Sequence, residues 1–148
     1  MNHIDDKLKV LGITLPAPVK PVANYVPWVI SGGQVFVSGQ LPMVDGKLMA
    51  GLDLDSRTKA ARQCAINIIA HLRDSCEGDL SRIKRIVKLT GFVASAADFT
   101  DHPKVVNGAS DLMVEVFGEG GRHARAAVGV SSLPLGASVE IEAIAEME

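Results

Sequence analysis

The chain has 148 residues, of which 47% are hydrophobic and 22% are charged, and its formal net charge at pH 7 is −2. A chain of this size can bury enough apolar surface to fold as one domain without metals or disulfides. The slight acidic excess argues against a dedicated nucleic-acid binder, which usually has a basic excess. Because there are only two cysteines, no apolar run long enough to span a bilayer and no secretory signal, we expect a cytoplasmic protein without a membrane partner.

The first residues predict a short helix and a proline-rich arm. Apolar residues recur at helical spacing from Ile4 to about Gly12, where the glycine is suited to end the helix. Three prolines within residues 15–21 then impose extended backbone. We therefore divide the chain into a leading helix and arm, residues 1–17, and a single domain, residues 18–148.

A β-hairpin is predicted next, with strands Tyr25–Ile30 and Gln34–Ser38 joined by a Ser-Gly-Gly turn. The segment up to the following helix reads as irregular, apart from a tight turn at Asp45-Gly46. A long amphipathic helix is predicted from about Ser56 to Arg73 or a little beyond, with Asp55 or Ser56 as its N-terminal cap.

The second half of the chain predicts one further helix and three strands. The strands are Ile83–Ala94, Arg125–Val130 and about Ser138–Ala145, and the helix is Pro103–Phe117 with Gly118 as its C-terminal stop. The order β-β-α-β-α-β-β gives an α+β two-layer sandwich, in which two helices cover one mixed sheet. Several strands are apolar on both faces, so we expect the uncovered face to be buried in a closed symmetric assembly.

The standard motifs of catalysis and cofactor binding are missing from this sequence. It has no Gly-x-Ser-x-Gly nucleophile turn, no phosphate-binding loop and no dinucleotide fingerprint. The four histidines have no metal-ligand spacing, and helix packing explains Cys64 and Cys76. We therefore expect neither a metal nor a cofactor.

The last quarter of the chain contains the residues most suggestive of a site. Arg125 starts an apolar strand, where a guanidinium is costly to bury unless it meets an anion. The closing strand offers Glu140 and Glu142, whose spacing directs both carboxylates to the same face. Taken by themselves, these residues are better explained by a structural Arg–Glu pair, or simply by exposed strand ends, than by a functional site.

Several features in this order resemble the Rid/YjgF family, over about residues 18–145. Ala-Arg-x-x-Val-x-Val-x-x-Leu-Pro, which starts at Ala124, and the closing strand Val-Glu-Ile-Glu-Ala-Ile-Ala are similar to its C-terminal signature. Ser38-Gly-Gln-Leu-Pro42 is similar to its Ser-Gly-Gln-x-Pro strand end, and Val87–Val93 with Asp98-Phe99 to its central strand and turn. Tyr25 and Asn107 stand where the family has a Tyr and an Asn.

The resemblance implies a chorismate-mutase-like fold, a homotrimer with ligand clefts between neighbouring subunits, and hydrolysis of enamines and imines such as 2-aminoacrylate to 2-keto acids and ammonia. Arg125 would bind the carboxylate of the substrate through a bidentate fork. Glu142 would orient the attacking water. The polar contacts of the cleft would come from Tyr25 and Asn107, with the backbone of Ser38 and Gly39 lining it.

This chain departs from the family pattern beside Arg125. Family members often have Pro-Ala-Arg where this chain has His123-Ala-Arg, and many have a Cys where it has Ala127. His123 could face the same side as Arg125 and change the pocket. Two other functions therefore stay open: a non-catalytic carboxylate binder or regulator on the same scaffold, and an endoribonuclease or translation inhibitor. The last has the least support, because the sequence offers no paired histidines and no basic groove.

Overall fold

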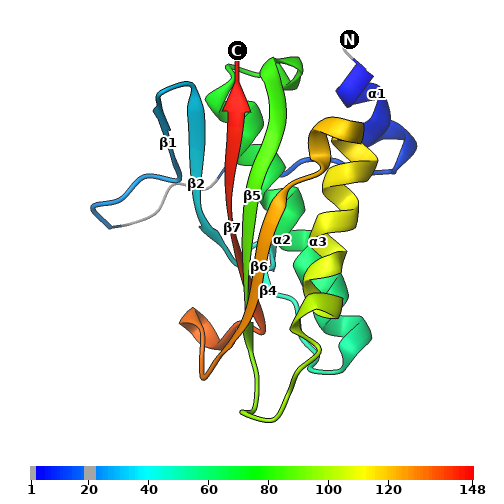
Figure 1. Cartoon of the computed structure of the whole chain (residues 1–148), viewed down its shortest axis with the longest axis vertical. Helices are drawn as coiled ribbons and strands as arrows, with labels where there is room; N and C mark the ends of the chain where they lie inside the picture. The colour runs from blue at the N-terminus through cyan, green and yellow to red at the C-terminus, as the bar shows by residue number, and fades with distance from the viewer. Residues whose placement is uncertain (1–2, 19–22) are drawn as a thin grey trace.

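Two layers make up the fold: a five-stranded sheet, and two long helices that pack against one of its faces (Figure 1). This computed structural model describes residues 3–18 and 23–148, so part of the predicted proline arm lies outside the described residues. The predicted α+β fold, with helices on one mixed sheet, is confirmed. The main elements are α1 (His3–Val10), β1 (Trp28–Ser31), β2 (Gln34–Gln40), β3 (Met43–Val44), β4 (Lys47–Leu48), α2 (Leu54–Ser75), β5 (Ile83–Ala94), α3 (His102–Phe117), β6 (Ala124–Val130) and β7 (Val139–Met147).

The strand order of the main sheet is β1-β2-β7-β5-β6, which makes β6 an edge strand. β5 and β6 are parallel and are connected through α3, whereas the other neighbouring strands are antiparallel. In β2, Val37 pairs with Ala143 but Gln40 pairs with Ile141, so β2 has one residue more than β7 between these pairs. The extra residue forms a β-bulge at Ser38-Gly39, which locally bends the strand.

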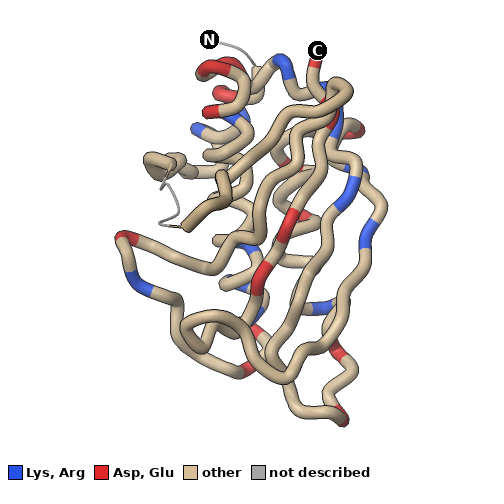
Figure 2. The backbone as a smooth tube through the Cα atoms, turned by 90° about the vertical axis from the view of Figure 1, so that its left-hand side faces the viewer, with Lys and Arg blue, Asp and Glu red and all other residues tan. Residues whose placement is uncertain are grey.

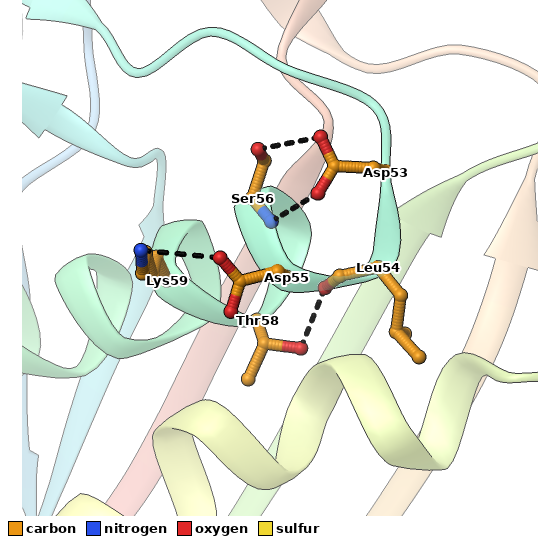
Figure 3. A network of polar contacts seen from close by, with 6 residues as sticks. All are labelled: Asp53, Leu54, Asp55, Ser56, Thr58 and Lys59. Atoms are coloured by element: carbon orange, nitrogen blue, oxygen red, sulfur yellow. Dashed lines mark hydrogen bonds and ion pairs between the residues drawn. The ribbon is translucent and has the colours of Figure 1, made fainter.

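The N-terminus of α2 is capped by Asp53, and the prediction of Asp55 or Ser56 as the cap was wrong (Figure 3). The Asp53 carboxylate accepts hydrogen bonds from the backbone N of Ser56 at 2.9 Å and from its Oγ at 2.8 Å. These two bonds lower the pKa of Asp53, because they favour its charged form. Asp55 lies inside the first turn, where it pairs with Lys59 at 3.1 Å.

The hairpin and the segment after it differ from the prediction for local reasons. β1 starts at Trp28 and not at Tyr25, because Pro27 has no N–H to donate to a strand ladder. The segment read as irregular contains the short hairpin β3–β4 around the Asp45-Gly46 turn. Strands of two residues are too short to show an alternating pattern in the sequence.

Both long helices pack closely against one face of the sheet, so no helix covers the other face in the described residues. Two glycines permit the approach: a Cβ on Gly91 would overlap the side chain of Val106, and one on Gly108 would overlap the backbone of Thr58. On the opposite face, Val29, Phe36 and Val128 are 49%, 40% and 43% exposed. No helix in the described residues is long and apolar enough to cross a membrane.

Candidate functional site

Arg125 points from the edge strand β6 toward α3. It pairs in register with Leu89, whose side chain is fully buried beneath the helices, so both side chains lie on the helix side of the sheet. Its Nη1 donates to Oδ1 of Asn107 at 2.7 Å and to Oγ of Ser110 at 3.1 Å. Arg125 takes part in none of the ion pairs formed by the described residues. The guanidinium of the half-buried Arg125 is thus held by neutral groups, and its charge has no counter-ion in the described chain.

His123 extends this arrangement through Ser110. Its Nε2 lies 2.9 Å from Oγ of Ser110, and its Nδ1 lies 2.6 Å from the carbonyl oxygen of Gly121. A carbonyl only accepts, so Nδ1 carries a proton, and in the neutral imidazole Nε2 then accepts the hydroxyl proton of Ser110. We call Arg125, Asn107, Ser110 and His123 the arginine cluster.

Three members of this cluster, Asn107, His123 and Arg125, were predicted from the sequence, whereas Ser110 was not. The available signal was its spacing: residues three apart on a helix share a face. Asn107 and Ser110 have this spacing within the predicted helix. This spacing places the Ser110 hydroxyl on the same helix face as the side-chain amide of Asn107.

Glu142 lies on the other face of the sheet from Arg125. It pairs with Thr90, which also pairs with Ala126, the residue after Arg125. Successive side chains alternate between faces, so Glu142 and Arg125 point in opposite directions. β5 also separates their strands, which places the two backbones about 10 Å apart. A single chain therefore does not bring Arg125 and Glu142 into one cleft.

Glu140 shares the outer face with Glu142 but has a more confined environment. Its carboxylate lies directly over Gly39 in the bulge of β2, where a Cβ on residue 39 would overlap it. Burial raises the pKa of Glu140, and the negative charge of Glu142 raises it further. The sequence showed that the two glutamates share a face, but it gave no sign that Glu140 is the partly buried one.

Tyr25, Ser38 and Gly39 lie together at the bulge. Ser38 donates from Oγ to the carbonyl of Val26 at 2.7 Å and from its backbone N to that of Pro27 at 2.9 Å. These bonds hold the segment after Tyr25 against β2. Tyr25, which is 59% exposed, joins Ser38 and Gly39 in lining a cavity of about 330 Å³. We call Tyr25, Ser38, Gly39 and Glu140 the bulge cluster.

The predicted site residues thus form two groups in one chain. β7 and β5 lie between β2, which carries Ser38 and Gly39, and β6, which carries Arg125. At the usual strand spacing the two strands are about 14 Å apart. In the described residues, no group of three or more His, Cys, Asp or Glu side chains could hold a metal ion.

Comparisons with known proteins agree with this fold. The family model described as YjgF/chorismate mutase-like, putative endoribonuclease, matches residues 5–147. Protein TCP17 of Trypanosoma cruzi is 50% identical over 153 aligned residues, which cover 99% of this chain and 95% of that protein. The crystal structure of Atu1372, a protein of unknown function from Agrobacterium tumefaciens, is 52% identical, with a TM-score of 0.90 and coverage of 98% of this chain and 94% of that one. A 2-iminobutanoate/2-iminopropanoate deaminase of Dermatophagoides farinae is 28% identical over 138 residues, covering 92% of this chain and 95% of that protein.

Proposed function

Because the chain belongs to the YjgF/chorismate mutase-like family, we propose that it hydrolyses small enamines and imines of the 2-aminoacrylate type to 2-keto acids and ammonia. The observation that carries this proposal is the guanidinium of the half-buried Arg125, which has hydrogen-bond partners but no counter-ion in the described chain. Such a cation favours a carboxylate ligand, because a carboxylate both neutralises it and accepts two parallel hydrogen bonds. The deaminase among the relatives supports the same reaction class.

To hydrolyse such a substrate, the protein mainly has to position the substrate and the attacking water. A 2-aminoacrylate first takes a proton on its terminal carbon and becomes an imine. The oxygen of water then adds to the imine carbon, and a carboxylate accepts one proton of that water. The resulting carbinolamine expels its nitrogen as ammonia, and the added oxygen becomes the keto oxygen. We assign the substrate carboxylate to Arg125 and the water to Glu142, next to the partly buried Glu140.

A second copy of the chain would bring Glu140 and Glu142 close to Arg125, which a single chain does not do. Arg125 has no anionic partner, and neither Glu140 nor Glu142 takes part in an ion pair formed by the described residues. The glutamates point from the outer face of the sheet, where Phe36 and Val128 are also exposed. We therefore propose a homotrimer, in which the arginine cluster of one subunit faces Glu142 and the bulge cluster of its neighbour.

Non-catalytic binding of a small carboxylate is the second candidate. The arginine cluster supports it directly, because that cluster lies within one chain and needs no placed water. An endoribonuclease has less support. Acidic as well as basic residues lie along the strands (Figure 2), and Glu140 and Glu142 point from the outer face of the sheet, an arrangement that does not favour a phosphate backbone.

The test is the release of ammonia and pyruvate from 2-aminoacrylate that a dehydratase generates in the same cuvette. The wild-type protein should accelerate release above the spontaneous rate. Arg125→Ala should lower kcat/KM by about 10- to 100-fold, the effect of losing a charge-assisted bidentate contact. The matched control is Arg122→Ala, since Arg122 is an exposed arginine that pairs with Glu119 at 3.3 Å, and it should keep wild-type activity.

Two results would reject the proposal. A wild-type protein without any acceleration would exclude the deaminase and leave carboxylate binding as the function. Equal rates for the wild type and Arg125→Ala would remove Arg125 from its assigned role. The shared site is tested separately, because light scattering that gives the mass of one chain in an active preparation would refute the homotrimer.

A further inference from the structure

We infer that Ser110 and His123 are positioning residues that turn the guanidinium of Arg125 so that its Nε–Nη2 edge receives the ligand. The inference rests on the proposed function, since it takes a carboxylate as the ligand of Arg125. The inference adds two points to the proposed function. The ligand carboxylate binds side-on, that is, to Nε and Nη2 of Arg125, and Ser110 and His123 impose this binding mode. Neither residue needs to touch the substrate.

The hydrogen atoms of the guanidinium decide which edge is available. Arginine has five N–H donors: two on Nη1, two on Nη2 and one on Nε. Nη1 donates to Oδ1 of Asn107 at 2.7 Å and to Oγ of Ser110 at 3.1 Å, which uses both of its hydrogens. A carboxylate bound end-on would need one of them, because that mode pairs Nη1 with Nη2. The side-on mode uses Nε and Nη2 and disturbs neither bond.

His123 determines the direction of the hydrogen bond at Ser110. The carbonyl of Gly121 accepts from Nδ1, so Nε2 presents its lone pair to the serine hydroxyl. Ser110 then donates its only proton to His123 and keeps its oxygen lone pairs for Arg125. Without that acceptor, a serine inside a helix tends to donate to the carbonyl one turn earlier, which would turn its oxygen away.

Close packing between α3 and the segment before β6 keeps His123 in place. A Cβ on Gly121 would overlap the backbone of Met113 and lie 2.8 Å from the Cα of Val114. Only a glycine lets the chain pass this close to the end of α3. The carbonyl that orients Nδ1 is thereby fixed to the same helix that carries Ser110. The parallel course of β6 beside β5 then directs Arg125 toward that helix (Figure 1).

The test follows the Arg125 side chain by NMR while pyruvate, a stable 2-keto acid, is added to the full-length protein. The Nε–Hε signal of Arg125, identified by its loss in Arg125→Lys, should move downfield and saturate in the wild type. In Ser110→Ala and His123→Leu, pyruvate should bind about tenfold more weakly, as expected for the loss of one hydrogen bond at a charged group. The Nε–Hε shift should also shrink in both variants.

Two further variants separate positioning from general damage. His123→Gln keeps a hydrogen-bond acceptor for the Ser110 hydroxyl, so it should bind pyruvate within about twofold of the wild type, a difference of well under 1 kcal/mol. Ser131→Ala removes an exposed hydroxyl just beyond β6 and should change nothing. Circular dichroism checks that each variant is folded, and His123→Leu provides the same test as Ser110→Ala from the other side of the hydrogen bond.

The outcomes distinguish this inference from the proposed function. Wild-type affinity in both Ser110→Ala and His123→Leu would overturn the inference, and so would pyruvate binding that leaves the Nε–Hε signal unmoved. A wild-type protein that binds no pyruvate would overturn both the inference and the carboxylate site. If the variants weaken binding as expected but the wild type releases no ammonia from 2-aminoacrylate, the inference stands and only the deaminase reaction is rejected.

Discussion

Gly108→Ala tests how closely α3 must approach α2, and with it the placement of the arginine cluster. A Cβ on residue 108 would overlap the carbonyl oxygen of Thr58 and lie 3.0 Å from its carbonyl carbon. Both atoms belong to the backbone of α2, so no side-chain rotation relieves the overlap. The helices would have to separate by about 1 Å to restore ordinary contact distances.

Two effects of opposite sign set the size of this change. Overpacking against an immobile backbone costs about 3 kcal/mol, at the upper end of the usual range. Replacing glycine by alanine inside a helix returns about 1 kcal/mol through helix propensity. The net loss of about 2 kcal/mol should lower Tm by about 4–8 °C for a chain of this length.

The assay is thermal unfolding at one fixed protein concentration, since the proposed assembly would make Tm depend on concentration. Asp111→Ala, at an exposed position of the same helix, also raises helix propensity but meets no neighbour, so its Tm should not fall. Pyruvate should bind more weakly to Gly108→Ala, because the neighbouring Asn107 moves with the helix. A Gly108→Ala protein at least as stable as the wild type would show that α3 does not need this close approach.

Two further predictions concern ionisation. The raised pKa of Glu140 means that its proton is held more tightly in the folded state, so stability is lost as the pH rises through that pKa. Glu140→Gln should therefore have a higher urea midpoint than the wild type at pH 7. If the difference in midpoint between the two proteins were the same at pH 4, the ionisation of Glu140 would not be its cause. The lowered pKa of Asp53 works in the other direction, because its stabilising cap is lost as the pH falls through that pKa. Asp53→Ala should lower the urea midpoint of unfolding at pH 7. Asp53→Asn should have a midpoint close to that of the wild type, because asparagine can also cap a helix. Equal losses in the two variants would contradict the role of Asp53 as the cap.

Periodicity predicted the long elements well and the short ones poorly. β5 has the predicted limits Ile83–Ala94, and α2 extends the predicted helix by two residues at each end. Both elements are long enough for many apolar positions to agree on one period. The cap was misassigned because Asp53 precedes Leu54, an exposed apolar residue that gives no sign of belonging to a helix.

The relation between Arg125 and Glu142 could not be predicted from the sequence. Each strand shows its own alternation, but the sequence does not say which residue of one strand lies beside which residue of the next. Irregularities at Ile86–Lys88 and at Val37–Gln40 shift the register in two strands that pair with β7. A shift of one residue exchanges the two faces of a strand. By contrast, Asn107 and Arg125 meet within the βαβ unit of β5, α3 and β6, where the helix has to pack over the strand that follows it.

The two separated clusters each contain a charge that forms no ion pair among the described residues: Arg125 in one and Glu140 in the other. On the helix side of edge strand β6, Arg125 is a cation held by neutral partners. On the outer face, Glu140 is a carboxylate whose ionisation is opposed by burial and by Glu142. Among the described residues, neither charge has an ion-pair partner that would offset its partial desolvation. In the proposed assembly, the edge of one copy would meet the outer face of another, and Arg125 would then anchor the substrate carboxylate near Glu142 and the partly buried Glu140. In the proposed enzyme, assembly therefore creates the active site from two halves, each of which can bind or accept a proton but cannot complete the reaction.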